Sequence, residues 1–137
     1  MAGELLIDTG AFVALVDRSE QAHAECVAVL EQWASPILTT EAVLTETIHL
    51  VGPQWPRQRA CLEFFARGAF ALTPSSRDSL RRVAELMAKY RELPMDFADA
   101  TLVALAEERR LDQVFTLDRR GFAIYRIYGR KPFRVVP

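Results

Sequence analysis

The chain has 137 residues and a mass of 15.5 kDa, a length that predicts one domain over residues 1–137. Half of the residues are apolar and 26% are charged, which is typical of a globular protein and excludes an intrinsically disordered chain. No apolar run reaches the roughly 18 residues of a membrane span, and the first ten residues lack the basic and apolar regions of a secretory signal. Cys26 and Cys61 lack the spacing of a zinc site or a disulfide framework. We therefore expect reduced core cysteines and a cytoplasmic protein without membrane contact.

The net charge of −1 conceals an uneven distribution along the chain. Residues 1–56 carry eight acidic side chains and one basic one, whereas residues 57–137 carry sixteen basic and ten acidic ones. Every charged residue after Asp118 is basic. Such a division is typical of proteins that bind a polyanion or a charged partner chain, and equally of a chain with oppositely charged solvated faces.

Short apolar segments alternate with helical patterns. Strands are predicted at 5–7, 37–38, 69–72 and 113–116, with a fifth at 125–128. Helices are predicted at 9–16, from Ser19 or Glu20 to about Trp33, from Thr39 or Thr40 to about Val51, at 56–67, from Ser75 or Ser76 to about Tyr90, and from Asp96 to about Arg110. Because strands and helices alternate with short connections, the pattern predicts an α/β fold with a parallel sheet and helices on both of its faces.

Several acidic residues stand in apolar segments, where an isolated carboxylate is costly. Asp8 and Asp118 directly follow the first and the fourth predicted strand, and the carboxyl ends of strands line the ligand crevice of open α/β sheets. Glu46 lies beside the apolar stripe of its helix. Asp99 stands in the first turn of an apolar helix, for which Asp96 is the predicted cap, and the helix macrodipole favours an anion there.

Each of these positions also has an ordinary structural interpretation. An aspartate at a strand end is commonly a turn or cap residue, and a glutamate on a helix is commonly a surface residue. If the acids converge, their mutual repulsion requires a cation. A set of carboxylates without cysteine or histidine indicates Mg²⁺ or Mn²⁺ rather than zinc.

Two other catalytic classes share part of this pattern. The run Ile7-Asp8-Thr9-Gly10-Ala11 also matches the catalytic loop of aspartic proteases, but their fold is almost wholly β, whereas residues 20–110 here are mainly helical in pattern. A haloacid-dehalogenase-type phosphatase needs a second aspartate two residues after the first, where this chain has Gly10. Neither a phosphate-binding P-loop nor a dinucleotide-binding glycine motif occurs in the sequence.

The acidic segments resemble the motifs of PIN-domain ribonucleases, most closely those of the VapC-type toxins of bacterial toxin–antitoxin pairs. The resemblance rests on Asp8 in LLIDTGAFVAL, Glu46 in TTEAVLTETIHL, Asp99 in PMDFADATLVALAEE and Asp118 in FTLDRRGF, and it runs from about Leu5 to Phe122. It implies a PIN-like three-layer α/β/α sandwich with a central, mainly parallel sheet of four or five strands. It also implies an endoribonuclease that uses Mg²⁺ or Mn²⁺ to hydrolyse RNA phosphodiester bonds.

The resemblance assigns a role to each matching residue. The expected catalytic acids are Asp8, Glu46, Asp99 and Asp118. Of these, Asp8, Asp99 and Asp118 are expected to bind metal, and Glu46 is expected to orient the attacking water. Thr9, Thr116 and Asp96 are expected to support the acids, and Arg119 and Arg120 are candidates for contacts with RNA phosphates.

The resemblance further implies an RNA substrate, a cognate antitoxin protein and a homodimer. Trp55, Phe64 and Phe65 are candidates for the dimer surface, although core packing is the simpler interpretation of the two phenylalanines. Two other functions stay open: a housekeeping RNA-processing nuclease without an antitoxin, and a PIN-fold scaffold that binds a protein. The complete set of acids favours an enzyme over a scaffold, and the short chain favours a toxin over a larger processing factor.

Overall fold

A central parallel sheet organises the chain. The computed structural model describes residues 4–137, so the first three residues of the predicted domain lie outside the described residues. Within that range, five strands form one sheet in the order β3-β2-β1-β4-β7, with every neighbouring pair parallel. Their bounds are β1 Leu5–Ile7, β2 Ile37–Thr39, β3 Phe70–Leu72, β4 Gln113–Phe115 and β7 Arg134–Val136. The predicted α/β architecture is thus confirmed.

The strand β1 lies at the centre of the sheet, between β2 and β4. Its three residues, Leu5 to Ile7, are fully buried, as expected for a parallel strand that is covered on both faces. The amide of Asp8 donates to the carbonyl oxygen of Phe115 at 3.1 Å, which continues the pairing of β1 with β4 by one residue. Asp8, the first acid of the predicted site, therefore stands at the middle of the carboxyl edge of the sheet.

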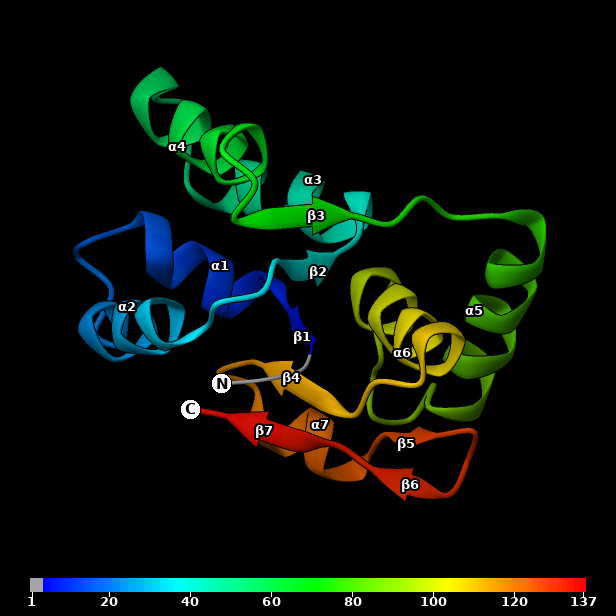
Figure 1. Cartoon of the computed structure of the whole chain (residues 1–137). Helices are drawn as coiled ribbons and strands as arrows, with labels where there is room; N and C mark the ends of the chain where they lie inside the picture. Colours follow the sequence, from blue (N-terminus) through cyan, green and yellow to red (C-terminus); the bar gives the residue numbers. More distant parts are fainter. Residues whose placement is uncertain (1–3) are drawn as a thin grey trace.

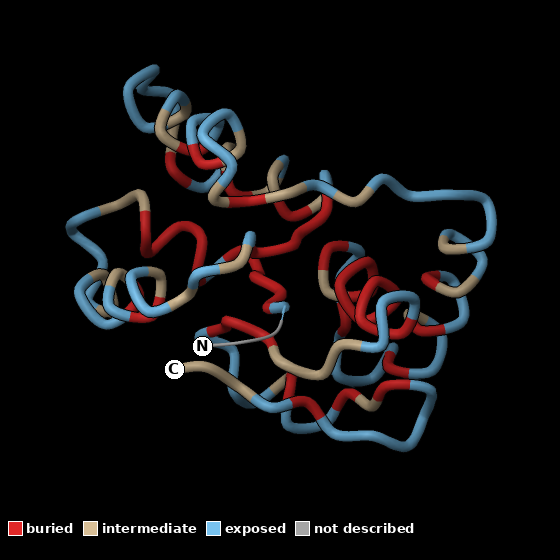
Figure 2. The backbone as a smooth tube through the Cα atoms, in the orientation of Figure 1, coloured by how far each residue is buried: buried red, intermediate tan, exposed pale blue. Residues whose placement is uncertain are grey.

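Helices cover both faces of the sheet. Their bounds are α1 Thr9–Val16, α2 His23–Gln32, α3 Glu41–Leu50, α4 Trp55–Ala66, α5 Arg77–Lys89, α6 Phe97–Arg109 and α7 Arg119–Ile124. In Figure 1, α1, α2 and α4 lie on one side of the strands, and α5 and α6 lie on the other. The helix α3 contacts α1 and α4 and also α6. Buried residues follow the strands and the helix sides that face them (Figure 2), which confirms the three-layer sandwich.

Side-chain caps begin five of the helices. Asp8, Thr40, Ser76, Asp96 and Asp118 each accept a hydrogen bond from the backbone N–H three residues further on. Such a bond satisfies one of the amides that have no partner inside the first turn of a helix. Three of these caps, Asp8, Asp96 and Asp118, are acids of the predicted site. The side chains that begin α1, α6 and α7 therefore also belong to the predicted site.

The chain after β4 differs from the prediction. The fifth strand of the sheet is β7, not the predicted segment at 125–128. Within that segment, β5 (Arg126–Ile127) pairs antiparallel with β6 (Lys131–Pro132) in a separate hairpin. The helix α7 was not predicted, because its six residues include two arginines and a glycine and show no helical period of apolar positions.

The helix α2 also begins later than predicted, at His23 instead of Ser19 or Glu20. The Asp17 carboxylate accepts hydrogen bonds from the amide and the hydroxyl of Ser19, at 2.9 and 2.6 Å, so the expected helix start is a turn. The ring nitrogen Nδ1 of His23 lies 2.6 Å from the carbonyl oxygen of Ala14, which joins the start of α2 to α1.

An aromatic cluster fills the core between α1, α4 and β3. Phe64 lies 5.8 Å from Phe12 and 4.6 Å from Phe70 between ring centroids, and Phe65 lies 5.6 Å from Phe70. Core packing is therefore the correct interpretation for Phe64 and Phe65. Trp55 differs from them, because 61% of it is exposed.

Two further expectations concern the setting of the chain. Cys26 and Cys61 are both buried and free, as predicted. Across residues 4–137, no helix has the length and apolar character needed to cross a bilayer.

Candidate active site

Asp8 is a buried carboxylate at the junction of β1 and α1, with 5% of the residue exposed. Its Oδ1 accepts a hydrogen bond from the amide of Ala11 at 3.2 Å, and its Oδ2 accepts one from the hydroxyl of Thr116. The Thr116 hydroxyl in turn accepts the amide of Asp118 at 2.9 Å. Thr116 therefore joins the carboxyl ends of β1 and β4 through one hydroxyl, and it holds Asp8 and Asp118 in a defined relation.

Asp118 caps α7 and needs a glycine beside it. Its Oδ1 accepts the amide of Gly121 at 3.0 Å. A Cβ atom built on Gly121 would lie 2.5 Å from Oδ2 of Asp118 and 3.2 Å from its Cγ. Since Gly121 is not among the residues with positive φ, this position favours glycine because the carboxylate approaches closely.

Asp99 enters the site from the first turn of α6. Its amide donates to Oδ1 of Asp96 at 2.8 Å, so Asp96 acts as the cap that the sequence predicts. Oδ2 of the half-buried Asp99 accepts the hydroxyl of Tyr125 at 3.3 Å. The Tyr125 ring is buried against Tyr90 and Phe122.

Sequence reasoning did not identify Tyr125 as a site residue. The sequence places it in a predicted strand, and no spacing marks its link to an acid 26 residues earlier. Burial and the negative charges of Asp99 and Asp118 raise the pKa of the Tyr125 hydroxyl. The hydroxyl therefore stays protonated and serves as a donor to Asp99.

Two hollows adjoin the acids. A cavity of about 430 Å³ is lined by Asp99, Asp118, Arg120 and Tyr125, among others. A second hollow of about 580 Å³ lies between α3 and the start of α6, and Glu46 and Asp96 are among the residues that line it. Glu46 is half-buried, as its place beside the apolar stripe predicts.

The electrostatics of Asp8 link the sheet edge to α3. Burial raises the pKa of Asp8 to about 6, although the hydrogen bonds from Thr116 and Ala11 lower it. The negative charges of Asp118 and Glu46 raise it further. Glu46 and Asp118 come from different elements, yet both act on this one carboxylate.

Asp99 shows the same effect more strongly. Burial raises its pKa to about 7, and the charges of Asp96, Asp8 and Asp118 contribute in the same direction. The structure thus brings Asp8, Asp99 and Asp118 within electrostatic reach of one another, with Glu46 and Asp96 at the sides. The amino ends of α1 and α6 partly offset the repulsion among these acids, because the helix macrodipole favours negative charge there.

The remaining predicted residues occupy different positions. Thr9 is buried as the first residue of α1. Arg120 lines the cavity beside Asp99 and Asp118. Arg119 instead donates a hydrogen bond from Nη2 to the carbonyl oxygen of Pro137 at 2.8 Å. Of the two neighbouring arginines, only Arg120 therefore lines the acidic cavity.

The donor set can be compared with what a metal ion needs. Within residues 4–137, no group of three or more histidine, cysteine, aspartate or glutamate side chains is arranged as a ready-made cage for a metal ion. Mg²⁺ keeps several of its waters and needs only one or two protein carboxylates. The carboxylates of Asp8, Asp99 and Asp118 therefore fit a hydrated Mg²⁺ or Mn²⁺ ion, and they do not fit the nitrogen and sulfur preference of zinc.

Comparison with known proteins identifies the family. The model of the PIN domain matches residues 5–128. Ribonuclease VapC26 of Mycobacterium tuberculosis (strain ATCC 25618 / H37Rv) is 30% identical over 135 residues, which cover 97% of this chain and 100% of that protein.

Three solved structures share the fold. VapC20 of Mycobacterium tuberculosis, described as a sarcin-ricin loop cleaving toxin, has a TM-score of 0.77 and 18% identity over 85% of this chain and 91% of its own. A toxin–antitoxin complex from Klebsiella pneumoniae has a TM-score of 0.68 and 22% identity, over 97% of this chain and 96% of its own. VapBC2 of Rickettsia felis, bound to promoter DNA, has a TM-score of 0.69 and 13% identity, over 98% of this chain and 100% of its own. The chain therefore belongs to the PIN-domain family and, within it, to the VapC ribonucleases.

Proposed function

We propose that this chain is a Mg²⁺- or Mn²⁺-dependent endoribonuclease that acts as the toxin of a toxin–antitoxin pair. The observation that carries the proposal is the electrostatic interaction among three carboxylates, which come from the ends of β1 and β4 and the start of α6. Burial and mutual repulsion raise the pKa of Asp8 to about 6 and that of Asp99 to about 7. Folding therefore maintains a concentration of negative charge that a divalent cation would relieve. Membership among the VapC ribonucleases supports RNA as the substrate.

Each acid has a separate role in the proposed reaction. Asp8 and Asp99 would hold the principal ion, Asp118 would hold a second ion or reach the first through water, and Glu46 would orient the attacking water. When bound, the ion supplies a nucleophile at neutral pH and neutralises charge that develops on the phosphate. Thr116 fixes the carboxylate of Asp8 through its hydroxyl.

Two further side chains act at the cavity. Tyr125 fixes the carboxylate of Asp99 by donating a hydrogen bond from its hydroxyl to Oδ2. Arg120 lines the same cavity and offers a guanidinium group to a phosphate of the RNA strand.

A cognate antitoxin is the expected protein partner. The Klebsiella and Rickettsia structures are toxin–antitoxin complexes, and one chain in each shares the fold of this chain. A basic side chain of an antitoxin would satisfy the same carboxylates that otherwise need a cation. Buried free cysteines and an RNA substrate agree with a cytoplasmic location.

The homodimer stays a prediction. Trp55 and Leu62 are two helical turns apart on α4, and 61% and 43% of these residues are exposed. Both therefore lie on one side of the helix, where Gln58 and Arg59 separate them. If a second copy covers this face, Trp55→Lys will convert a dimer into a monomer in sedimentation equilibrium, and an unchanged mass would exclude the face.

The test of the function compares wild type with Asp8→Asn and with a control, Asp78→Asn, whose side chain is 91% exposed on α5. With Mg²⁺, wild type and control should cleave cellular RNA at defined ends. Asp8→Asn should lose cleavage by orders of magnitude, because a displaced or missing ligand removes the ion that supplies the nucleophile.

Metal binding has its own readout. Mg²⁺ should raise the melting temperature of wild type and of Asp78→Asn, but not of an Asp8→Asn/Asp99→Asn double variant, because stabilisation by a ligand disappears with its site. Equal stabilisation of all three proteins would contradict the assigned ligands. Folded wild-type protein that binds an antitoxin but cleaves no RNA would instead indicate a protein-binding scaffold.

A further inference from the structure

The β5–β6 hairpin holds a tyrosine in an unusual backbone conformation. The amide of Arg130 donates to the carbonyl oxygen of Ile127 at 3.1 Å and closes a turn. Its two central residues, Tyr128 and Gly129, have φ values of 52° and 71°. Turns of this type favour asparagine or glycine at the first position, and a bulky side chain there is rare unless its surroundings impose the conformation.

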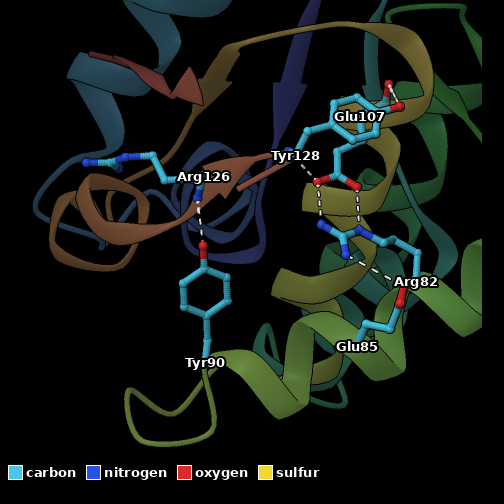
Figure 3. A network of polar contacts seen from close by, with 6 residues as sticks. All are labelled: Arg82, Glu85, Tyr90, Glu107, Arg126 and Tyr128. Carbon is cyan, nitrogen blue, oxygen red and sulfur yellow. Dashed lines mark hydrogen bonds and ion pairs between the residues drawn. The ribbon is translucent and has the colours of Figure 1, made fainter. Parts of the chain in front are cut away.

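Glu107 of α6 imposes it. Only 3% of Glu107 is exposed. Its carboxylate accepts hydrogen bonds from Nε and Nη2 of Arg82, at 2.7 and 3.0 Å. The same carboxylate accepts the amide of Tyr128 at 2.6 Å, and the Tyr128 hydroxyl donates to the Glu107 carbonyl oxygen at 3.0 Å, as Figure 3 shows. One of these bonds holds the backbone of Tyr128 and the other holds its ring, while 56% of the tyrosine stays exposed.

The fixed ring borders a basic groove. This groove has a volume of about 390 Å³ and lies at the carboxyl end of α6, and its lining residues are Arg110, Leu111, Ile127, Tyr128, Arg130 and Lys131. Lys131 is paired with Asp112 at 3.2 Å. Among residues 4–137, neither Arg110 nor Arg130 forms an ion pair, so two arginines that line the groove with Tyr128 have no ion-pair partner in the described chain.

We propose that this groove binds single-stranded RNA, with a base stacked on Tyr128 and the flanking phosphates held by Arg110 and Arg130. A rigid exposed aromatic ring beside arginines is the combination that binds single strands, because every base has a stacking face and every linkage a charge. An acidic peptide would use the arginines but would gain little from the ring. The charge and the ring together therefore favour RNA.

The groove would extend the acidic site along the substrate. Arg110 and Asp99 are eleven residues apart along α6 and its end, a distance of about 16 Å at the helical rise. A strand that occupies both the groove and the acidic cavity must therefore span at least this distance. This inference rests on the proposed ribonuclease function, because it assigns the groove to the same substrate.

Binding is best measured in the Asp8→Asn background, where the RNA is not consumed. The probe is a short fluorescein-labelled single-stranded RNA of mixed sequence, and its anisotropy is followed at several salt concentrations. Tyr128→Leu should weaken binding about tenfold without changing the salt dependence, because the lost stacking involves no ion release. Tyr128→Phe keeps the ring and should bind within about twofold of the parent.

The arginines should act through charge. Arg130→Ala should weaken binding and reduce the slope of log affinity against log salt by about 0.7, the value for one lost contact with a single strand. Arg110→Asn should do the same, and asparagine tolerates the left-handed backbone at that position. The matched control is Arg18→Ala, an exposed arginine in the loop between α1 and α2, at the opposite end of the molecule from the hairpin in Figure 1.

The proposal would be overturned if Tyr128→Leu and Arg130→Ala both bound the RNA with the affinity and the salt slope of Arg18→Ala. Weaker binding of an acidic protein by those two variants would not rescue it, because the proposed ligand is RNA. Arg130 is exposed, so Arg130→Ala decides the question if Tyr128→Leu fails to fold in thermal denaturation. Hydrolysis of bis-p-nitrophenyl phosphate by protein with Asp8 intact reports on the acidic site alone. Failure of the proposed function is therefore distinguishable from failure of the groove.

Discussion

The buried carboxylate of Asp8 opposes folding at neutral pH, and replacing it with asparagine tests that cost directly. Burial, helped by the charges of Asp118 and Glu46, raises its pKa from 3.8 to about 6. Since a tenfold change in proton affinity corresponds to about 1.4 kcal/mol, the ionised form costs the folded state about 3 kcal/mol. Asparagine has nearly the same shape and carries no charge.

The sign of the pH dependence follows from linkage. The pKa of Asp8 is higher in the folded protein than the value of 3.8 expected when unfolded, so the folded state binds more protons between about pH 4 and pH 6. Wild-type stability therefore falls as the pH rises through that window. Asparagine also disturbs the hydrogen bond with the Thr116 hydroxyl, at a cost of about 1 kcal/mol.

The expected result reverses between acid and alkaline conditions. Without divalent cations, Asp8→Asn should be about 2 kcal/mol more stable than wild type at pH 8 and about 1 kcal/mol less stable at pH 4. Urea unfolding followed by far-ultraviolet circular dichroism measures both differences. Asp78→Asn, with its 91% exposed side chain, controls for the loss of an acid as such. The same destabilisation of Asp8→Asn at both pH values would refute the reasoning.

Three other substitutions test single contacts. Gly121→Ala places a Cβ atom 2.5 Å from Oδ2 of Asp118 and should displace that carboxylate. RNA cleavage should then fall up to about a hundredfold while stability changes by less than about 1 kcal/mol, and full activity would show that the carboxylate adapts. Tyr125→Phe removes the hydroxyl donor to Asp99, which raises the pKa of that carboxyl and should move the acid limb of the cleavage pH profile to higher pH. An unmoved limb would count against this hydrogen bond. Glu107→Gln removes the buried charge that pairs with Arg82, whose partly exposed guanidinium keeps its ion pair with Glu85 at 3.6 Å. The loss of the charged hydrogen bonds should lower the free energy of unfolding by about 2 kcal/mol in urea titration. A loss below about 1 kcal/mol would show that the pair is dispensable.

The sequence by itself determined the elements whose signals are local. The residues of β1 form an uninterrupted apolar run because both faces of that strand are covered. Asp96 could be assigned as a cap, and the other two caps could be narrowed to Thr39 or Thr40 and to Ser75 or Ser76, because short polar side chains satisfy amides within the next turn. The structure selects Thr40 and Ser76. Asp8 and Asp118 stood out because each follows an apolar strand, and their position at a sheet edge follows from that order alone.

Only the tertiary structure decided the contacts between distant segments. The strand β7 exists because β4 offers it an edge, where the amide of Arg134 donates to the carbonyl oxygen of Asp112 at 2.7 Å. Its three residues carry too little pattern to reveal this pairing. Tyr125 reaches Asp99, and Glu107 positions Tyr128, across more than twenty residues in each case. Those contacts depend on how the hairpin packs on α6, and no local propensity or period records that packing.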